Sequence, residues 1–172
     1  MERANLFDGF TTIGRTLHAA AEAPKTAAEL LESMDRTGVA EALVLDSLSR
    51  EYHPLAGNKR VLETVGGHPR LHPAWSILPH GASDEQPGPD ELVARMKEHQ
   101  VGALFLFPAQ YGFELSDWAV DGFMEPLARE NVPVFVNYND SRNMSMDACR
   151  WGELVEFCRR WPRLPVILTE MR

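Results

Sequence analysis

The feature that most constrains the fold is a repeat of apolar strand patterns, spaced by about 30 residues, the length of one strand-helix unit. Short apolar runs begin near residues 5, 41, 72, 102, 132 and 164. The segments between them carry apolar residues at helical spacing, which predicts helices. Strands alternating with helices predict an α/β fold with a parallel sheet. The period alone leaves a closed barrel and an open doubly wound sheet as alternatives.

The expected boundaries follow from the apolar runs and from helix start and stop signals. Thr26 and Glu29 have the spacing of a capping box, and Gly38 stands where a helix ends. Strands are expected at residues 5–14, 41–47, 72–78, 102–107, 132–138 and 164–169. Helices are expected at 27–37, 54–65, from 89 onward, 121–130 and 146–160, with loops at 81–89 and 108–118.

Composition excludes several classes of protein. The chain has 172 residues, of which 44% are hydrophobic, so one domain with a sizeable core is expected. The net charge is −8, and no basic cluster exceeds the pair Arg159 and Arg160. Because the phosphate backbone requires patches of Lys and Arg, this balance argues against nucleic acid as a partner.

The sequence also argues against a membrane location. No apolar run reaches transmembrane length, and the N-terminus is no signal peptide. Cys149 and Cys158 lie in one expected helix, too far apart for a disulfide that leaves the helix intact. Unpaired cysteines are typical of a reducing compartment, so a cytoplasmic location is expected.

Common catalytic motifs are absent from the sequence. No Gly-x-Gly-x-x-Gly or phosphate-loop motif follows an expected strand, which argues against an open nucleotide-binding sheet. No Gly-x-Ser-x-Gly elbow is present to support a Ser-His-Asp arrangement. The histidines show no metal-ligand spacing.

Several short sequence segments, taken in their order along the chain, resemble the amidohydrolase-related family, a TIM-barrel group of metal-dependent hydrolases and decarboxylases. They are Phe7-Asp8, the segment 26–39, Asn58, His68-Pro69-Arg70-Leu71-His72-Pro73, Leu92-Val93-Ala94-Arg95 followed by Gly102, Val132-Pro133-Val134, and 161–168. The resemblance covers essentially the whole chain. It implies a (β/α)8 TIM-barrel type of fold, of which this chain holds the first six βα units as a partial barrel.

The resemblance also implies a metal site that this sequence does not reproduce. Family members carry a His-x-His pair after the Asp of strand one, and the aligned positions here are Phe10 and Thr12. The family histidines that end strands five and six fall on Asn137 and near Glu170. Imidazole is the ligand that zinc-class ions prefer, so degenerate metal ligands and no resident cofactor are expected.

Six units are fewer than the eight of the family barrel. TIM barrels typically span about 250 residues, so residues 1–172 are expected to form a single barrel domain truncated before strands seven and eight. Three explanations compete: the chain is a fragment, the six units close differently, or a second copy covers the open sheet edges as a homo-oligomer. The fragment is the favoured explanation, because the chain stops at a strand end.

The candidate site residues are those expected at the carboxyl ends of the strands. Asp8, at the end of the first strand, is the candidate catalytic base. The candidate ligand-binding residues are Asp46, Asn137, Asp140, Glu170 and Arg172. For Asp8 and Asp46 the alternative is a structural role, in which Asp8 bonds a neighbouring backbone and Asp46 pairs with Arg50.

Two functions from different classes follow. The first is an active, divergent hydrolase whose oxygen-rich site works without metal or holds a hard cation through carboxylates. The second is a non-catalytic relative that has lost its metal and binds a small polar molecule or a partner protein. The four substituted histidine positions favour the second: Phe10, Thr12, Asn137 and the position near Glu170.

Overall fold

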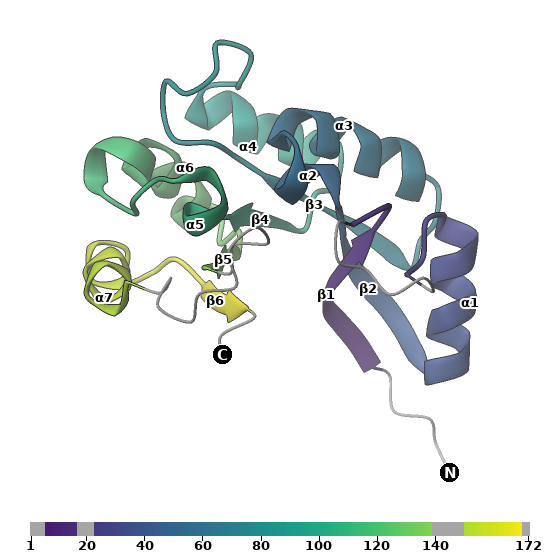
Figure 1. The fold of residues 1–172 in the computed structure, drawn as a ribbon. Helices are drawn as coiled ribbons and strands as arrows, with labels where there is room; N and C mark the ends of the chain where they lie inside the picture. Colours follow the sequence, from purple (N-terminus) through teal and green to yellow (C-terminus); the bar gives the residue numbers. More distant parts are fainter. Residues whose placement is uncertain (1–5, 17–22, 139–149, 170–172) are drawn as a thin grey trace.

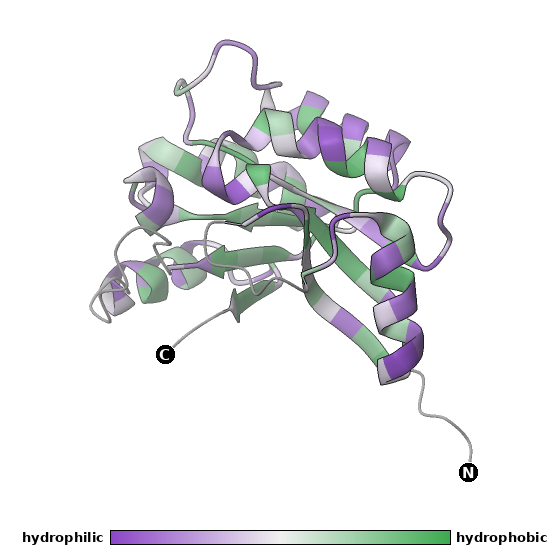
Figure 2. Cartoon of the chain, turned by 45° about the vertical axis from the view of Figure 1, so that its right-hand side comes forward, coloured by the Kyte–Doolittle hydropathy of each residue, from purple (hydrophilic) through white to green (hydrophobic). Residues whose placement is uncertain are grey.

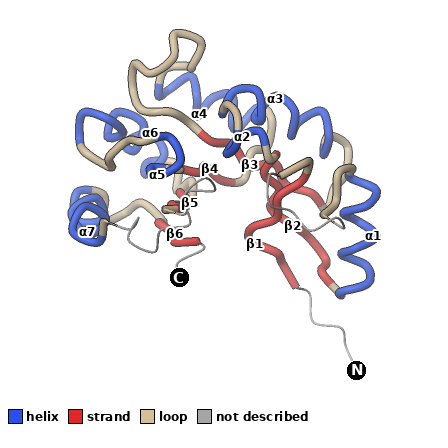
Figure 3. Tube along the Cα trace, viewed as in Figure 1, coloured by secondary structure: helices blue, strands red, loops and turns tan. Residues whose placement is uncertain are grey.

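The computed structural model describes residues 6–16, 23–138 and 150–169, and within them strands and helices alternate (Figure 3). The strands are β1 (Leu6–Ile13), β2 (Val39–Asp46), β3 (Leu71–Ser76), β4 (Ala103–Leu106), β5 (Val134–Asn137) and β6 (Val166–Thr169). The helices are α1 (Ala27–Thr37), α2 (Leu48–Glu51), α3 (Pro54–Val65), α4 (Pro89–Glu98), α5 (Pro108–Tyr111), α6 (Gly122–Arg129) and α7 (Trp151–Arg160), with a π-helical turn η1 (Asp117–Asp121). The expected alternation is confirmed.

Local chemistry explains the boundaries that agree with the sequence prediction. The Thr26 hydroxyl accepts the N–H of Glu29 at 3.2 Å and begins α1. Gly38 ends that helix with a φ of 78°, in the left-handed region. Pro54 and Pro89 each occupy the first turn of their helices, where a missing N–H removes no hydrogen bond. The short helices α2 and α5 were not expected, since four residues are too few to leave a helical pattern in the sequence.

The strands form one parallel sheet in the order β1-β2-β3-β4-β5-β6. A strand order that never reverses places every right-handed crossover on the same side of the sheet, whereas a doubly wound sheet reverses its order. The sheet accordingly curls, with α1, α3, α4, α6 and α7 along its outer side (Figure 1). This arrangement is a partial TIM barrel and resolves the alternative that the repeat left open.

Buried side chains form an outer and an inner layer. The outer layer lies between the sheet and the helices and includes Val44, Val61 and Val136. The inner layer lies on the concave side and consists of Leu43, Leu45, Ala74, Ala103, Phe105, Phe107 and Phe135, with Phe10 and Tyr111 packed against it. Because neighbouring strand residues point to opposite faces, the central strands β2, β4 and β5 contribute to both layers. These strands are largely hydrophobic (Figure 2).

The two outermost strands, β1 and β6, each pair with one neighbour among the described residues. Their apolar side chains are the exposed ones in the sheet: Leu6 and Phe7 on β1 are 50% and 56% exposed, and Ile167 and Leu168 on β6 are 36% and 38% exposed. Open apolar edges were expected from the strand count. Whether a second copy covers them stays a prediction.

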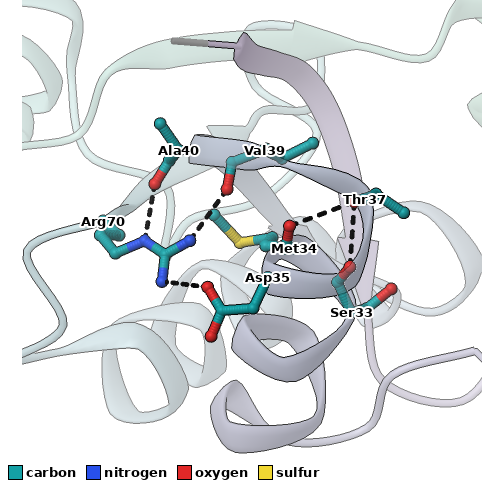
Figure 4. Close-up of polar contacts among 7 residues, drawn as sticks. All are labelled: Ser33, Met34, Asp35, Thr37, Val39, Ala40 and Arg70. Atoms are coloured by element: carbon teal, nitrogen blue, oxygen red, sulfur yellow. Dashed lines mark hydrogen bonds and ion pairs between the residues drawn. The ribbon is translucent and has the colours of Figure 1, made fainter. Parts of the chain in front are cut away.

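Arg70 joins α1, β2 and β3 at the amino end of the sheet (Figure 4). Its guanidinium donates to the carbonyls of Ala40 and Val39 at 2.7 and 2.8 Å and to the carboxylate of Asp35 at 2.8 Å. The planar fork of arginine satisfies carbonyls that the crossing from α1 to β2 would otherwise leave to solvent. Arg163 occupies the equivalent place in the second Pro-Arg-Leu phrase, before β6, and is exposed.

Replacing Arg70 by Ala is expected to lower the free energy of unfolding by about 2 kcal/mol, since three charge-assisted hydrogen bonds are lost at a partly exposed site. Urea unfolding followed by circular dichroism measures the change. Arg163→Ala is the matched control and should remain within about 0.5 kcal/mol of the parent chain. Equal losses in the two variants would show that the hydrogen bonds of Arg70 contribute nothing specific to the free energy of unfolding.

Candidate functional site

The carboxyl ends of the six strands converge at one rim of the curled sheet. In parallel α/β folds this rim carries the chemistry, because loops of several strands meet there. The residues that end or directly follow the strands there are Ile13, Asp46, Ser76, Phe107, Asn137 and Thr169. Successive residues of a strand point to opposite faces of the sheet, and this alternation decides which of these side chains reach the concave side.

Asp8 does not lie at this rim, and its expected position at the end of the first strand is wrong. β1 continues through Phe10, Thr11 and Ile13, residue types that favour strands, and Asp8 pairs in register with Ala42 in the middle of β2. Its carboxylate accepts the N–H of Phe10 at 3.0 Å and the hydroxyl of Thr11 at 2.5 Å, across a bulge. This is the backbone-bonding role named as its alternative. The catalytic role of Asp8 stays a prediction.

Asp46 ends β2 as expected, but its side chain belongs to the helix side of the sheet. Val44 and Asp46 share one face of the strand, and Val44 packs in the outer layer. The carboxylate is almost fully buried, accepts the N–H of Leu48 at 2.9 Å and lies 3.5 Å from Nε of Arg60 on α3. These contacts hold the start of α2 against α3. A ligand-binding role for Asp46 stays a prediction.

Asn137 ends β5 on the concave side, because Phe135 packs in the inner layer two residues earlier. It is fully buried, and its amide donates to the hydroxyl of Thr169 on β6 at 3.2 Å. The structure thus places an amide at the rim where the resemblance implies a metal-binding histidine. The other candidates, Asp140, Glu170 and Arg172, lie outside the described residues.

Aromatic rings fill the concave side below the rim. Phe105 stacks on Phe135 with ring centroids 4.6 Å apart and on Phe107 at 5.9 Å. Phe10 packs on Phe105 at 5.1 Å. Phe10 is therefore the aromatic edge of the inner layer at the very position where the family carries its first histidine.

Among the residues that the structure describes, the side chains at the rim do not fit a bound metal ion. Across 6–16, 23–138 and 150–169, no group of three or more His, Cys, Asp or Glu side chains could hold one. Phe10 offers no lone pair, and the amide of Asn137 is a poor ligand for zinc-class ions.

Arg50 extends over this aromatic layer from α2. Its guanidinium carbon lies 5.8 Å from the centroid of the Phe107 ring, and the side chain is half-buried. A guanidinium held over an aromatic face is a cation-π contact, which keeps the planar donor edge oriented. The short sequence Ser47-Leu48-Ser49-Arg50 after the second strand marks this segment, but nothing in it indicates the contact with Phe107.

A buried polar network fixes the segment that carries Arg50. Asn58 on α3 donates to the Ser76 carbonyl and accepts the Ser76 N–H, both at 2.8 Å. The Ser49 carbonyl accepts the hydroxyls of Tyr111 at 2.8 Å and Ser76 at 3.1 Å. In the sequence, Asn58 stands out only as part of the resemblance to the amidohydrolase-related family. The hydrogen bonds of Ser49, Ser76 and Tyr111 are not predicted from the sequence.

A hollow with a volume of about 350 Å³ lies beside α5. It is on the helix side of the rim, since Tyr138 packs in the outer layer. Its lining residues are Pro108, Ala109, Gly112, Phe113, Glu114, Tyr138 and Arg150. Two of these residues, Arg150 and Glu114, form an ion pair.

Burial raises the pKa of the Asp46 carboxyl, and the N–H of Leu48 and the charge of Arg60 only partly oppose the effect. With a folded-state pKa above the unfolded value of about 3.9, the folded state binds the proton more tightly. That contribution to stability is complete below the unfolded pKa and is lost as pH rises through the raised folded pKa. Replacing Asp46 by Asn, which cannot ionise, should therefore become relatively more favourable as pH rises.

The measurement is the free energy of urea unfolding of Asp46→Asn and of the parent chain at pH 4 and pH 7. The value of the variant minus that of the parent should increase between the two. Asp84→Asn, at an exposed loop position, should show a smaller change. A difference that is constant or falls with pH contradicts the raised pKa.

Solved structures of amidohydrolase-superfamily TIM-barrel proteins share this arrangement. An uncharacterised TIM-barrel protein from Bordetella bronchiseptica matches with a TM-score of 0.65 at 14% identity, over 94% of this chain and 65% of its own. A probable 2-pyrone-4,6-dicarboxylic acid hydrolase from Acinetobacter baumannii, with citric acid bound, matches with a TM-score of 0.60 at 15% identity, over 95% and 57%. For 5-carboxyvanillate decarboxylase from Sphingomonas paucimobilis the TM-score is 0.61 at 14% identity, over 95% and 67%.

No protein-family model matches the chain, and no curated protein matches it significantly. No helix of the described residues is long and apolar enough to cross a membrane. The chain spans 57–67% of the length of the three solved structures. At these identities the likeness concerns architecture alone, and the resemblance read from the sequence is confirmed at that level: the described residues form part of a TIM-barrel fold, with six consecutive parallel strands and the helices that connect them.

Proposed function

We propose that this protein binds small planar carboxylates at the carboxyl ends of its strands, as a relative of metal-dependent hydrolases and decarboxylases whose metal ligands are degenerate. The observation that carries the proposal is the guanidinium of Arg50 held 5.8 Å above the buried ring of Phe107. It places an oriented cation beside an aromatic layer at the rim where parallel α/β folds bind ligands.

The chemistry of these groups selects the ligand class. Arginine binds carboxylates through two parallel N–H donors, and its planar fork favours a carboxylate in a defined orientation. Phe10 is partly exposed and packs on the buried ring of Phe105, so it presents the edge of the aromatic inner layer to a flat ring. Asn137 lies at the same rim, where it is fully buried and its amide donates to Thr169. A benzene or pyrone ring that carries a carboxylate suits both the guanidinium of Arg50 and the exposed edge of Phe10.

The names of the similar structures support this class of ligand. One is described as a hydrolase of a pyrone dicarboxylic acid and holds citric acid, and another is a decarboxylase of carboxyvanillate. Because this chain spans only 57% and 67% of those proteins, their activities do not transfer with the fold. What transfers to the proposal is the kind of molecule, a small acid that bears carboxylates.

Binding is favoured over catalysis by the state of the two candidate acids that the structure describes, Asp8 and Asp46. An active hydrolase would need Asp8 to face a substrate, yet its carboxylate is engaged by Phe10 and Thr11 well below the rim. Asp46 is turned toward α3 and pairs with Arg60. Neither carboxylate is placed to abstract a proton from a molecule held under Arg50.

Isothermal titration with isophthalate (benzene-1,3-dicarboxylate) tests the proposal on protein treated with a chelator. The parent chain should bind, and Arg50→Gln should weaken the affinity about 10-fold or more, since a hydrogen-bonded ion pair to the ligand is lost. Arg36→Gln is the matched control. It removes one positive charge from an exposed position at the opposite end of the sheet and should leave the affinity unchanged.

Two results would contradict the proposal. The first is an absence of binding by the parent chain at millimolar isophthalate. The second is an equal loss in Arg50→Gln and Arg36→Gln, which would reduce the effect to net charge. Recovery of binding only after addition of zinc would instead indicate a metal site.

A further inference from the structure

We infer that Tyr111 is a positioning residue for Arg50, and that it sets the spacing between the guanidinium and the aromatic layer. The inference rests on the proposed function, because it assigns Tyr111 a role in the same carboxylate site. The observation behind it is that one side chain connects the two groups that would hold the ligand.

The helix that carries Arg50 cannot hold its own position. α2 has four residues, Leu48–Glu51, fewer than a helix needs to be stable by itself. Its orientation therefore depends on contacts from other elements. The Asp46 carboxylate bonds the N–H of Leu48, and the N–H of Ser47 bonds the carbonyl of Ile13 at 2.9 Å. These contacts fix where α2 begins.

The far side of α2 is fixed through the peptide group between Ser49 and Arg50. The carbonyl of Ser49 accepts hydroxyls from Tyr111 and Ser76, which come from two different segments of the rim. Because the peptide group is planar, holding this carbonyl also orients the Arg50 N–H and the Cα from which its side chain extends. Gly57 packs closely against the same residue, since a Cβ there would lie 2.2 Å from the Ser49 nitrogen.

Tyr111 also holds the other half of the site. Its N–H bonds the carbonyl of Phe107 at 3.1 Å, and its ring packs against the inner layer. Tyr111 therefore links the two groups, since its backbone N–H bonds the carbonyl of Phe107 and its hydroxyl bonds the Ser49 carbonyl in the peptide group before Arg50. The length of this side chain fixes how far the guanidinium stands above the ring of Phe107.

A fixed distance between the guanidinium of Arg50 and the aromatic layer affects which ligands fit the site. A carboxylate attached to a flat ring can reach the guanidinium while its ring remains near the aromatic layer. Without the Tyr111 hydroxyl, Ser76 alone would hold the Ser49 carbonyl, so α2 would keep its fold but gain freedom. Affinity would then fall because the arginine must be ordered when the ligand binds.

The variant that tests the inference is Tyr111→Phe, which removes one hydroxyl and keeps the ring. Its dissociation constant for isophthalate should rise about 3- to 10-fold, the effect of one lost hydrogen bond. In an Arg50→Gln background the same change should have no further effect, because there is no guanidinium left to position. A purely structural role for Tyr111 would weaken binding equally in both backgrounds. Tyr52→Phe, at an exposed tyrosine directly after α2, is the matched control and should bind like the parent.

A second measurement does not depend on any ligand. Hydrogen-deuterium exchange of the N–H groups of residues 50–53, which bond within this segment, should be faster in Tyr111→Phe than in Tyr52→Phe and the parent. Unchanged exchange overturns the inference, and so does an additive effect of Tyr111→Phe and Arg50→Gln on binding. If the parent does not bind isophthalate, the proposed function fails and exchange alone decides whether Tyr111 holds α2.

Discussion

The structure depends on the parallel pairing of each strand with the strand before it in the chain. Parallel neighbours require a crossover, and right-handed crossovers between strands in unbroken order put all the helices on one side. The sheet must then curl around its other face, as β1 through β6 do. The two consequences that matter for function are a concave face and a rim where all carboxyl ends meet.

What the concave face can do is decided by strand alternation. Residues two apart share a face, so Phe135 and Asn137 point inward while Asp46 follows Val44 to the helix side. The inward positions here include aromatic rings and an amide. The same geometry that could bring metal ligands together therefore assembles an aromatic layer with Arg50 beside it.

Much of the fold was predictable from the sequence because its signals are local. The helices at 27–37 and 54–65 were predicted to the residue, since capping residues and glycines mark their ends. The site was less predictable. The place of Asp8 depends on a bulge and on how far β1 continues. The contact of Arg50 with Phe107, and that of Tyr111 with Ser49, join segments about 60 residues apart, and no periodicity encodes such contacts.

The most direct test of a carboxylate site beneath Arg50 is a crystal structure of the chain with 5-bromoisophthalate, in which anomalous scattering locates the bromine. We expect one site on the concave side, with a carboxylate within hydrogen-bond distance of Arg50 and the ring against Phe10, at the exposed edge of the aromatic layer. A ligand in the hollow between α5 and Arg150, or a metal ion at the rim with the carboxylate bound to it, would contradict this assignment.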